Sequence, residues 1–218
     1  MTQLVVFDIA GTTVRDTGLV AKAFIDAFNE FNIDVPVMTV NQFMGFRKKD
    51  AIRMLLPQQN EELAEQIHDA FTRNMLHIYE NDPELQPLPY AETVFQQLKQ
   101  RGIKIALNTG FTRTVTNTIL QRLQWTIPET IDMVVCSDEV PEGRPYPFMI
   151  KTIMQQLAVT DSQTVVKVGD TKVDVEEGRN AGCGLVVSVT TGACPRSELE
   201  LYKPDRIIDT LAELLTLL

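Results

Sequence analysis

Two aspartates follow apolar segments that have the character of buried β-strands. Asp8 comes after Val5-Val6-Phe7 and just before a glycine turn at Gly11, and Asp170 comes after Val165-Val166-Lys167-Val168-Gly169. A carboxylate in such a place can attack phosphorus, bind a metal ion, or do both. The alternative for each is structural, because an aspartate also caps a turn or the helix that follows a strand. Asp8 taken alone does not decide between the two.

A metal ion is the chemistry that both aspartates could share. Asp174 follows Asp170 by one helical turn. Mg²⁺ is usually held by one or two carboxylates together with the phosphate of the substrate. It neutralises charge on a phosphoryl group during transfer. Two acids at two strand ends of one sheet weaken the capping alternative, so we expect a Mg²⁺ site that includes Asp8 and Asp170.

Phosphate-binding groups stand at two further strand ends. Thr109-Gly110 ends one expected strand, and Arg144 lies in a loop between Gly143 and Pro145 just after another. Arginine suits the bidentate binding of phosphate. Each loop alone is an ordinary turn. Together with the two acids, they predict one site for phosphoryl transfer.

The elements that must position these residues alternate between short apolar runs and helical patterns. Strands are expected at 4–7, 103–108, 133–136, 164–168, 184–189 and 206–208. Continuous apolar runs suit parallel strands that are covered on both faces. The order predicts an α/β fold, a doubly wound and mostly parallel Rossmann-like sheet. Such sheets bind ligands at the carboxyl ends of the strands.

The first crossover is much longer than one helix requires. Its excess predicts helices at 20–31, 40–43, 48–56 and 61–79, followed by a link with prolines at 83, 87 and 89. We therefore expect an α/β core made of residues 1–15 and 87–218. Residues 16–86 should form an inserted helical cap.

With its motifs in place, the chain resembles the haloacid dehalogenase superfamily over essentially its whole length. The matching residues are Asp8-Ile9-Ala10-Gly11-Thr12, Thr109, Arg144 and Gly169-Asp170-Thr171-x-x-Asp174. The resemblance implies that Asp8 is the nucleophile and that Thr109, Gly110 and Arg144 bind the phosphoryl group. It also implies Mg²⁺ held by Asp8, the backbone carbonyl of Ala10 and Asp170, with Asp174 in support.

Ala10 departs from the phosphatases of this superfamily, which place an acid there to protonate the leaving group. A methyl group cannot donate a proton, and lost acid catalysis costs about 10²–10⁴-fold. Dehalogenases of the superfamily also lack that acid, but they work without magnesium, and the intact Asp170…Asp174 set argues against dehalogenation. Asp-x-Ala-Gly-Thr-Thr, Arg144 and the segment 139–147 look instead like the phosphonatase (phosphonoacetaldehyde hydrolase) subfamily.

Phosphonatases use a cap lysine that forms a Schiff base with the substrate aldehyde, so that the leaving group is an enamine carbon. The matching segment, Met44-Gly45-x-x-Lys48-x-Asp50, places that lysine at Lys48 and implies a substrate contact for Met44. The residues alone leave an alternative, because Arg47-Lys48-Lys49 could be a solvated basic helix start. Spacing does not choose between Lys48 and Lys49; the resemblance chooses Lys48.

Three pocket positions differ from the phosphonatase pattern. Gly18 stands for a cysteine, Ala51 for a cap histidine that assists proton transfer, and Phe111 for a tyrosine. Each change loses a polar group, so we expect a relative of phosphonoacetaldehyde as substrate. The two histidines of the long cap helix, His68 and His77, are expected to be ordinary helix residues.

The sequence thus predicts a Mg²⁺-dependent phosphonatase-like hydrolase that cleaves the C–P bond of a 2-oxoalkylphosphonate through a Lys48 imine and an Asp8 aspartyl phosphate. The alternative is a phosphatase for a small metabolite with a good leaving group, such as an anhydride or acyl phosphate. A third class is a binding module that keeps the fold without catalysis. Release of phosphate from a substrate would exclude this third class.

The net charge and the cysteines exclude several classes of partner and site. The 218 residues carry a net charge of −9, which opposes binding to nucleic acid or to an anionic membrane surface. Three separated cysteines indicate a reduced protein without disulfides or a zinc site. We expect a cytoplasmic protein with a small-molecule phosphonate or phosphate substrate. The resemblance further implies a homodimer formed through the cap.

Overall fold

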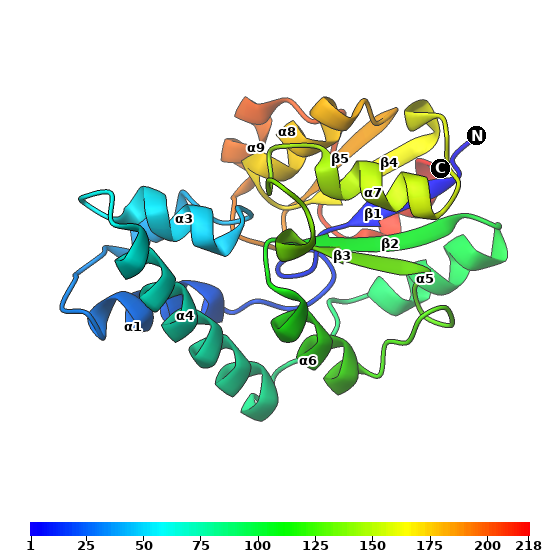
Figure 1. Ribbon diagram of the computed structural model, residues 1–218. Helices are drawn as coiled ribbons and strands as arrows, with labels where there is room; N and C mark the ends of the chain where they lie inside the picture. Colours follow the sequence, from blue (N-terminus) through cyan, green and yellow to red (C-terminus); the bar gives the residue numbers. More distant parts are fainter.

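A six-stranded parallel sheet forms the centre of the protein, as the computed structural model of residues 1–218 shows (Figure 1). The strand order is β3-β2-β1-β4-β5-β6. The strands are β1 (Leu4–Phe7), β2 (Lys104–Thr109), β3 (Met133–Cys136), β4 (Val165–Gly169), β5 (Leu185–Val189) and β6 (Arg206–Ile208). The expected doubly wound α/β fold is confirmed. β1 and β4, the strands that precede Asp8 and Asp170, are adjacent at the middle of the sheet.

Helices cover both faces of the sheet, and successive side chains of a strand point to opposite faces. The side chains of one strand therefore divide between two apolar clusters. Val5 and Phe7 of β1 belong to one apolar cluster, and Leu4 and Val6 belong to another. The first face is covered by α5 (Ala91–Gln100), α6 (Arg113–Leu123) and the short helix η3 (Leu211–Thr216). The second is covered by α7 (Phe148–Gln156) and α8 (Lys172–Ala181). The remaining short elements are η1 (Ser137–Glu139), η2 (Ser162–Thr164) and α9 (Arg196–Tyr202).

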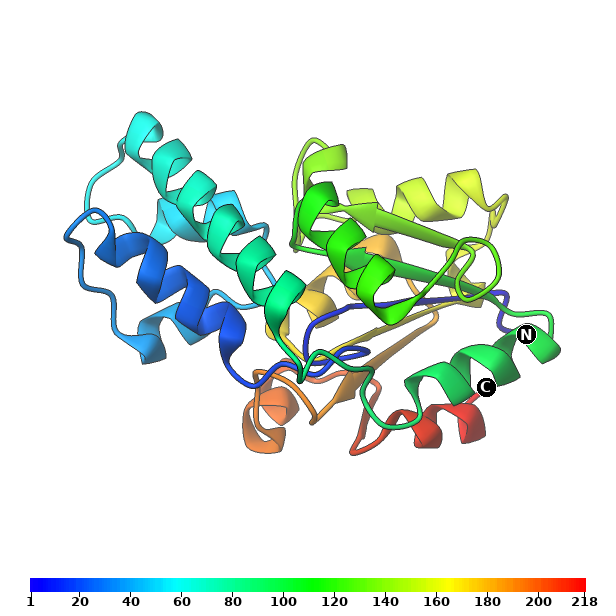
Figure 2. The ribbon, with the colours of Figure 1, turned by 90° about the horizontal axis from the view of Figure 1, so that it is seen from below.

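Five helices lie between β1 and β2; α5 covers the sheet, and the first four form a separate layer beside it (Figures 1 and 2). They are α1 (Leu19–Asn29), α2 (Val37–Asn41), α3 (Lys48–Leu55) and α4 (Glu61–Asn81). α1 packs against α4, with the rings of Phe24 and Phe71 4.5 Å apart. We call these four helices the cap.

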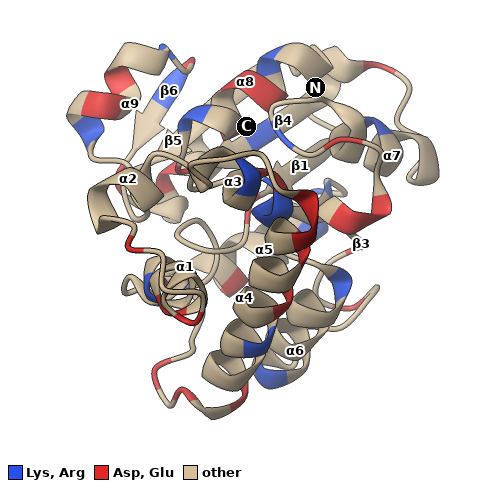
Figure 3. Cartoon of the chain, turned by 60° about the vertical axis from the view of Figure 1, so that its left-hand side comes forward, with Lys and Arg blue, Asp and Glu red and all other residues tan.

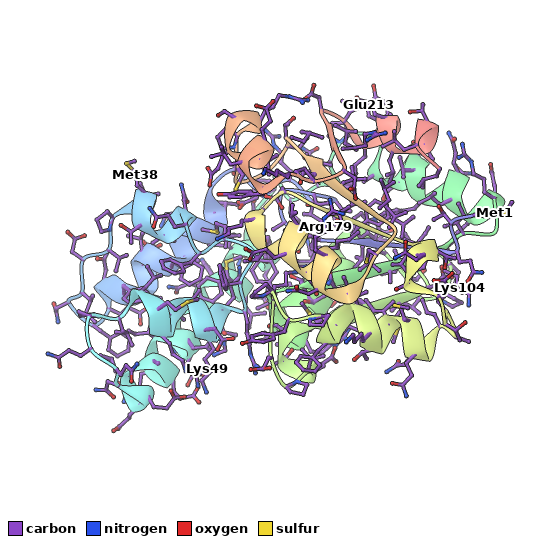
Figure 4. The ribbon with its side chains drawn as sticks, turned by 90° about the horizontal axis from the view of Figure 1, so that it is seen from above. Met1, Met38, Lys49, Lys104, Arg179 and Glu213 are labelled. Atoms are coloured by element: carbon purple, nitrogen blue, oxygen red, sulfur yellow. The ribbon has the colours of Figure 1, made fainter.

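The second cap helix begins earlier than the pattern predicted. α2 spans Val37–Asn41, not 40–43, and the turn after Asn41 is not helical. Val37 and Met38 are exposed, and Figure 4 shows Met38 at the outside of the molecule. The prediction was wrong because it followed buried apolar side chains, whereas the first turn of this helix faces solvent.

The two connections between the cap and the sheet run side by side. Val14 forms bridges with Ala10 and with Pro87, and the backbone N–H of Leu88 donates to the carbonyl of Thr13. The chain therefore leaves the sheet and returns to it at one place. The boundaries at residues 16 and 86 stay a prediction. None of the helices combines the length and the apolar character that a bilayer-spanning segment requires.

Candidate active site

Asp8 lies directly after β1 and is almost fully buried. Its backbone N–H donates to the carbonyl of Val168 at 2.9 Å, and its own carbonyl accepts from the hydroxyl of Thr13. The chain then turns at Gly11, whose φ is +82°. A Cβ at Gly11 would lie 2.7 Å from Oδ2 of Asp170, so this turn requires glycine. The turn thereby brings the backbone after Asp8 against the second acid.

Asp170 follows β4 and faces the same end of the sheet. Its Oδ1 accepts from the hydroxyl of Thr12 at 3.0 Å, and its Oδ2 accepts from the backbone N–H of Ala193 at 2.7 Å. The helix that follows is capped by Thr171 together with Asp174, so Asp170 is not its cap. Burial, and next the charge of Asp8, raise the pKa of Asp170 to about 8.

Three buried carboxylates meet at this edge. One oxygen from each of Asp8, Asp170 and Asp174 lies within 4.8 Å of the others. Desolvation raises the pKa of Asp8, whereas the cations around Asp174 outweigh its burial and lower its pKa. A donor set made only of carboxylate oxygens fits a hard divalent cation. The carboxylate oxygens at this edge therefore fit the cation site that the sequence predicts.

Arg144 is the cation nearest to Asp8. Its Nη1 lies 2.7 Å from Oδ1 of Asp8 and 3.1 Å from Oδ1 of Asp174, and the side chain is fully enclosed. Its Nε contacts Glu177 at 2.9 Å, and its Nη2 donates to the backbone and side-chain oxygens of Asn108. These contacts fix the plane of the guanidinium.

A second buried cation, Lys167, lies behind Arg144, and the sequence analysis assigned no role to it. Nζ of Lys167 lies 2.9 Å from Asp174, 3.4 Å from Glu177 and 2.7 Å from Oδ1 of Asn108. We call Asn108, Lys167, Asp174 and Glu177 the buried polar network. A lysine in the middle of a fully buried strand was the signal that could have found it, because an unpaired charge is rarely buried there.

The cap brings Lys48 to the opposite wall of the site. Lys48 has only 5% of its surface exposed, and its Nζ lies 5.7 Å from the ring centre of Phe24 and 5.0 Å from that of Phe111. No carboxylate forms an ion pair with it. Burial is the main cause that lowers the pKa of Lys48 to about 8. The neutral fraction of this amine near neutral pH is therefore much larger than that of an exposed lysine, which favours a nucleophilic role.

Lys49 has a different environment. Its Nζ pairs with Glu61 and Glu65 of α4, and these pairs raise its pKa. Figure 3 shows basic residues of α3 beside acidic residues of α4, and Lys49 is labelled on the cap in Figure 4. Of the two neighbouring lysines, Lys48 lines the cavity of the site and Lys49 does not.

Hydrogen bonds to backbone carbonyls hold the cap against the sheet around this cavity. The backbone N–H of Lys48 donates to the carbonyl of Gly110 at 3.2 Å, and Nη1 of Arg144 donates to the carbonyl of Gly45 at 3.3 Å. A Cβ at Gly45 would lie 2.3 Å from Oγ1 of Thr171, and one at Gly110 would lie 2.2 Å from the carbonyl oxygen of Phe46. Such distances leave no room for a side chain.

The cavity between cap and sheet contains most of the predicted site residues. Those that line it are Asp8, Ala10, Met44, Lys48, Thr109, Gly110, Arg144 and Asp170. Asp174 lies behind Arg144 in the buried polar network and does not line it. Asp16, which the sequence did not single out, does. The oxygen of Thr109 accepts from the N–H of Phe111 at 3.1 Å, which orients the hydroxyl.

Comparison with known proteins places this arrangement in a family. A model of the haloacid dehalogenase-like hydrolases matches residues 5–188, which include both strand-end acids and the whole cap. The protein belongs to the haloacid dehalogenase-like hydrolases. As a member of this family, it is a hydrolase.

Individual relatives indicate which branch of the family the chain resembles. A phosphonoacetaldehyde hydrolase from Bordetella pertussis is 32% identical over 250 residues, covering 97% of this chain and 89% of that protein. A hydrolase from Pseudomonas syringae has the same fold, with a TM-score of 0.88, 19% identity and coverage of 99% and 97%. A phosphonoacetaldehyde hydrolase-like protein from Oleispira antarctica has a TM-score of 0.83 at 24% identity, covering 99% and 91%. The phosphonatase-like branch predicted from the motifs is thus supported over the whole chain.

The positions that depart from the phosphonatase pattern lie in different surroundings. Phe111 lines the cavity and packs edge-on against Tyr79, with the ring centres 5.8 Å apart. Ala51 is fully buried in α3, and Gly18 lies at the start of α1, outside the cavity lining. His68 is half-buried, His77 is exposed, and neither lines the cavity, which agrees with the expectation of ordinary helix residues.

Proposed function

We propose that this hydrolase cleaves the C–P bond of phosphonoacetaldehyde or a related 2-oxoalkylphosphonate with the help of Mg²⁺. The single observation that carries the proposal is the environment of Lys48. A buried lysine without a carboxylate partner, on the wall opposite Asp8, suits an amine that forms an imine and has no structural role in an ion pair. The 32% identity to a phosphonoacetaldehyde hydrolase supports the same chemistry.

The reaction divides between the two walls of the cavity. Nζ of Lys48 attacks the substrate carbonyl, and loss of water leaves an iminium at that carbon. Asp8 then attacks phosphorus, the C–P bond breaks, and its electron pair passes toward the iminium to give an enamine. Arg144, Thr109 and Gly110 bind the phosphoryl oxygens. Because the leaving group is a carbon stabilised as an enamine, the methyl group of Ala10 costs this reaction nothing.

The carboxylates of Asp8 and Asp170, with the carbonyl of Ala10 and Asp174 in support, would hold the Mg²⁺. When bound, the ion supplies positive charge that offsets the phosphoryl oxygens and the crowded acids. Hydrolysis of the Asp8 acyl phosphate by water releases phosphate. Protonation of the enamine at carbon and hydrolysis of the imine then return Lys48.

Trapping of the imine tests the proposal. Wild-type protein incubated with phosphonoacetaldehyde and borohydride should gain a stable adduct on Lys48, located by peptide mass spectrometry. Lys48→Met should abolish the adduct, and Lys49→Met is the matched control because Lys49 is tied to Glu61 and Glu65. If the wild type forms no adduct on Lys48, the C–P mechanism is wrong.

The second candidate function is a phosphatase that acts on a small metabolite with a good leaving group. The apolar residues in the cavity favour this function. Ala10 and Phe111 line the cavity without offering a proton donor. Anhydrides and acyl phosphates need no such donor, because their leaving groups are weak bases. Phosphate release across a panel of phosphonates, acyl phosphates and phosphate esters, with and without Mg²⁺, separates the two functions. A homodimer through the cap stays a prediction that light scattering can test.

A further inference from the structure

The cavity lacks proton-transfer groups where related enzymes carry them. Ala10 stands at the acid position of the superfamily phosphatases, and Ala51 at the position of the phosphonatase cap histidine. Phe111 brings a ring without a hydroxyl group. Imine formation nevertheless needs a group that can take a proton from the lysine and return one to the departing water. Another residue must therefore carry the proton in this protein.

Five ionisable side chains line the cavity, and four of them already have a task. Asp8 and Arg144 pair with each other at 2.7 Å, Asp170 accepts two hydrogen bonds, and Lys48 is the amine itself. The fifth is Asp16. It is half-buried and lies in the connection that leads from β1 into the cap.

The two oxygens of Asp16 have different surroundings. Oδ1 accepts hydrogen bonds from the backbone N–H groups of Gly18 at 3.0 Å, Leu19 at 2.9 Å and Val20 at 3.5 Å. These contacts hold the carboxylate against the start of α1. Oδ2 takes part in none of these bonds and in no ion pair. One oxygen therefore fixes the side chain, and the other is free to exchange a proton.

Asp16 also has a connection to solvent. It lines the active-site cavity together with Lys48, and it lines a neighbouring groove together with Arg15, Pro87 and Thr191. A carboxylate shared by a cavity and an adjoining groove can pass protons between them. The negative charge of Asp16 also acts on Lys48, whose pKa it raises against the stronger effect of burial.

We propose that Asp16 is the proton-transfer residue for the Lys48 imine, an inference that rests on the proposed function. The neutral amine of Lys48 attacks the carbonyl carbon, and Oδ2 of Asp16 passes one N–H proton to the carbonyl oxygen, which becomes a hydroxyl group. Asp16 then takes a proton from solvent through the adjoining groove and gives it to that hydroxyl group. The C–O bond breaks, and water leaves the iminium. Amine, carbonyl and one proton thus give iminium and water, and the carboxylate is restored.

Asp16→Asn separates this role from the structural one. Asparagine keeps an oxygen that can accept the three N–H bonds, so the start of α1 should remain capped. Its amide cannot carry the proton. We expect the rate of borohydride-trapped imine formation with phosphonoacetaldehyde to fall by about 10²-fold or more, with an unchanged melting temperature.

Asp16→Ala provides a further readout that a capping role would not give. This variant should lose the same rate, and added formate should restore part of it in proportion to its concentration. If Asp16→Asn traps the imine within about threefold of the wild-type rate, or if formate has no effect on Asp16→Ala, the inference is wrong. An absence of adduct in the wild type would overturn the proposed function as well, so the two failures are distinguishable.

Discussion

Nη1 of Arg144 lies 2.7 Å from Oδ1 of Asp8, and both side chains are buried. The cation that is expected to bind the phosphoryl group thus also contacts the group that is expected to attack it. Desolvation raises the pKa of Asp8, and the charge of Arg144 acts against this effect, so the ion pair favours the carboxylate form. The guanidinium geometry matters as much as its charge, because Glu177 and Asn108 occupy its other nitrogens.

Arg144→Lys should therefore lower kcat/KM for phosphate release by about 10²–10³-fold, since an ammonium cannot make these contacts and bind a phosphoryl group together. Steady-state phosphate release measures the loss. Arg179→Lys is the control, because Arg179 makes a bidentate pair with Asp205 at the surface. Equal losses in both variants would contradict the role given to Arg144.

Gly45→Ala should displace the cap from the sheet. The added Cβ would meet Thr171 at 2.3 Å, and misplacement of Lys48 relative to Asp8 should reduce kcat/KM by about 10–100-fold. Gly102→Ala is a matched control. Gly102 also has a positive φ, +73°, but no atom lies within 4 Å of its added Cβ. The Gly102→Ala variant should lose about 1 kcal/mol in its free energy of unfolding and keep its activity.

Lys48→Met should stabilise the protein while it abolishes imine formation. Burial lowers the pKa of Lys48 from 10.5 to about 8, so keeping the ammonium buried at pH 7 costs free energy. We expect the free energy of unfolding to rise by about 1–3 kcal/mol at pH 7 in urea titrations. Between pH 8 and 10.5 the unfolded state binds more protons, so the cost in the wild type falls with rising pH. The difference between the two proteins should shrink over that range.

Imine formation should follow the same titration of Lys48. The reactive form is the neutral amine, so the trapping rate should rise with pH through about 8 and then level off. Borohydride trapping over a series of buffers measures this curve. A rate that keeps rising toward the ordinary lysine pKa of 10.5 would contradict the effect of burial.

Metal binding should depend on the ionisation of Asp170. In the protein without metal, the folded-state pKa of Asp170 is about 8, above its unfolded value of 3.8. The stability that this group contributes is complete below pH 3.8 and is lost as pH rises through about 8. Mg²⁺ should offset that loss, so its effect on the melting temperature should be larger at pH 8 than at pH 5. Asp170→Asn should abolish this Mg²⁺ effect and the Mg²⁺-dependent activity.

Lys167→Met should destabilise the protein by about 3–5 kcal/mol, because Asp174 and Glu177 would lose a buried partner. Urea denaturation measures the change. The surface residue Lys172 pairs only with Glu176, and Lys172→Met should change stability by less than about 0.5 kcal/mol. A mild effect at Lys167 would show that Arg144 alone balances the buried acids.

What could be predicted from the sequence depended on where the signal for each residue lay. Asp8 and Asp170 could be found because each directly follows an apolar strand, and parallel strands bring their carboxyl ends to one edge. Lys167 and Glu177 lie one layer behind that edge, where only the three-dimensional arrangement shows what they contact. Asp16 was missed because its place in the cavity depends on how the cap closes over the sheet.

The position of β1 in the sheet has a consequence for how the chain folds. β1 is the first strand of this sheet to be synthesised, but it pairs on one side with β2, which begins at Lys104, and on the other with β4, which begins at Val165. One edge therefore stays unpaired until β2 has been made and the other until β4 has been made, and contacts between residues so distant in sequence form slowly. A nascent or truncated chain that ends before β4 presents an apolar strand with an open edge, which is a site for aggregation or for a chaperone. The central strand that precedes Asp8 thus needs protection until β4 has been made.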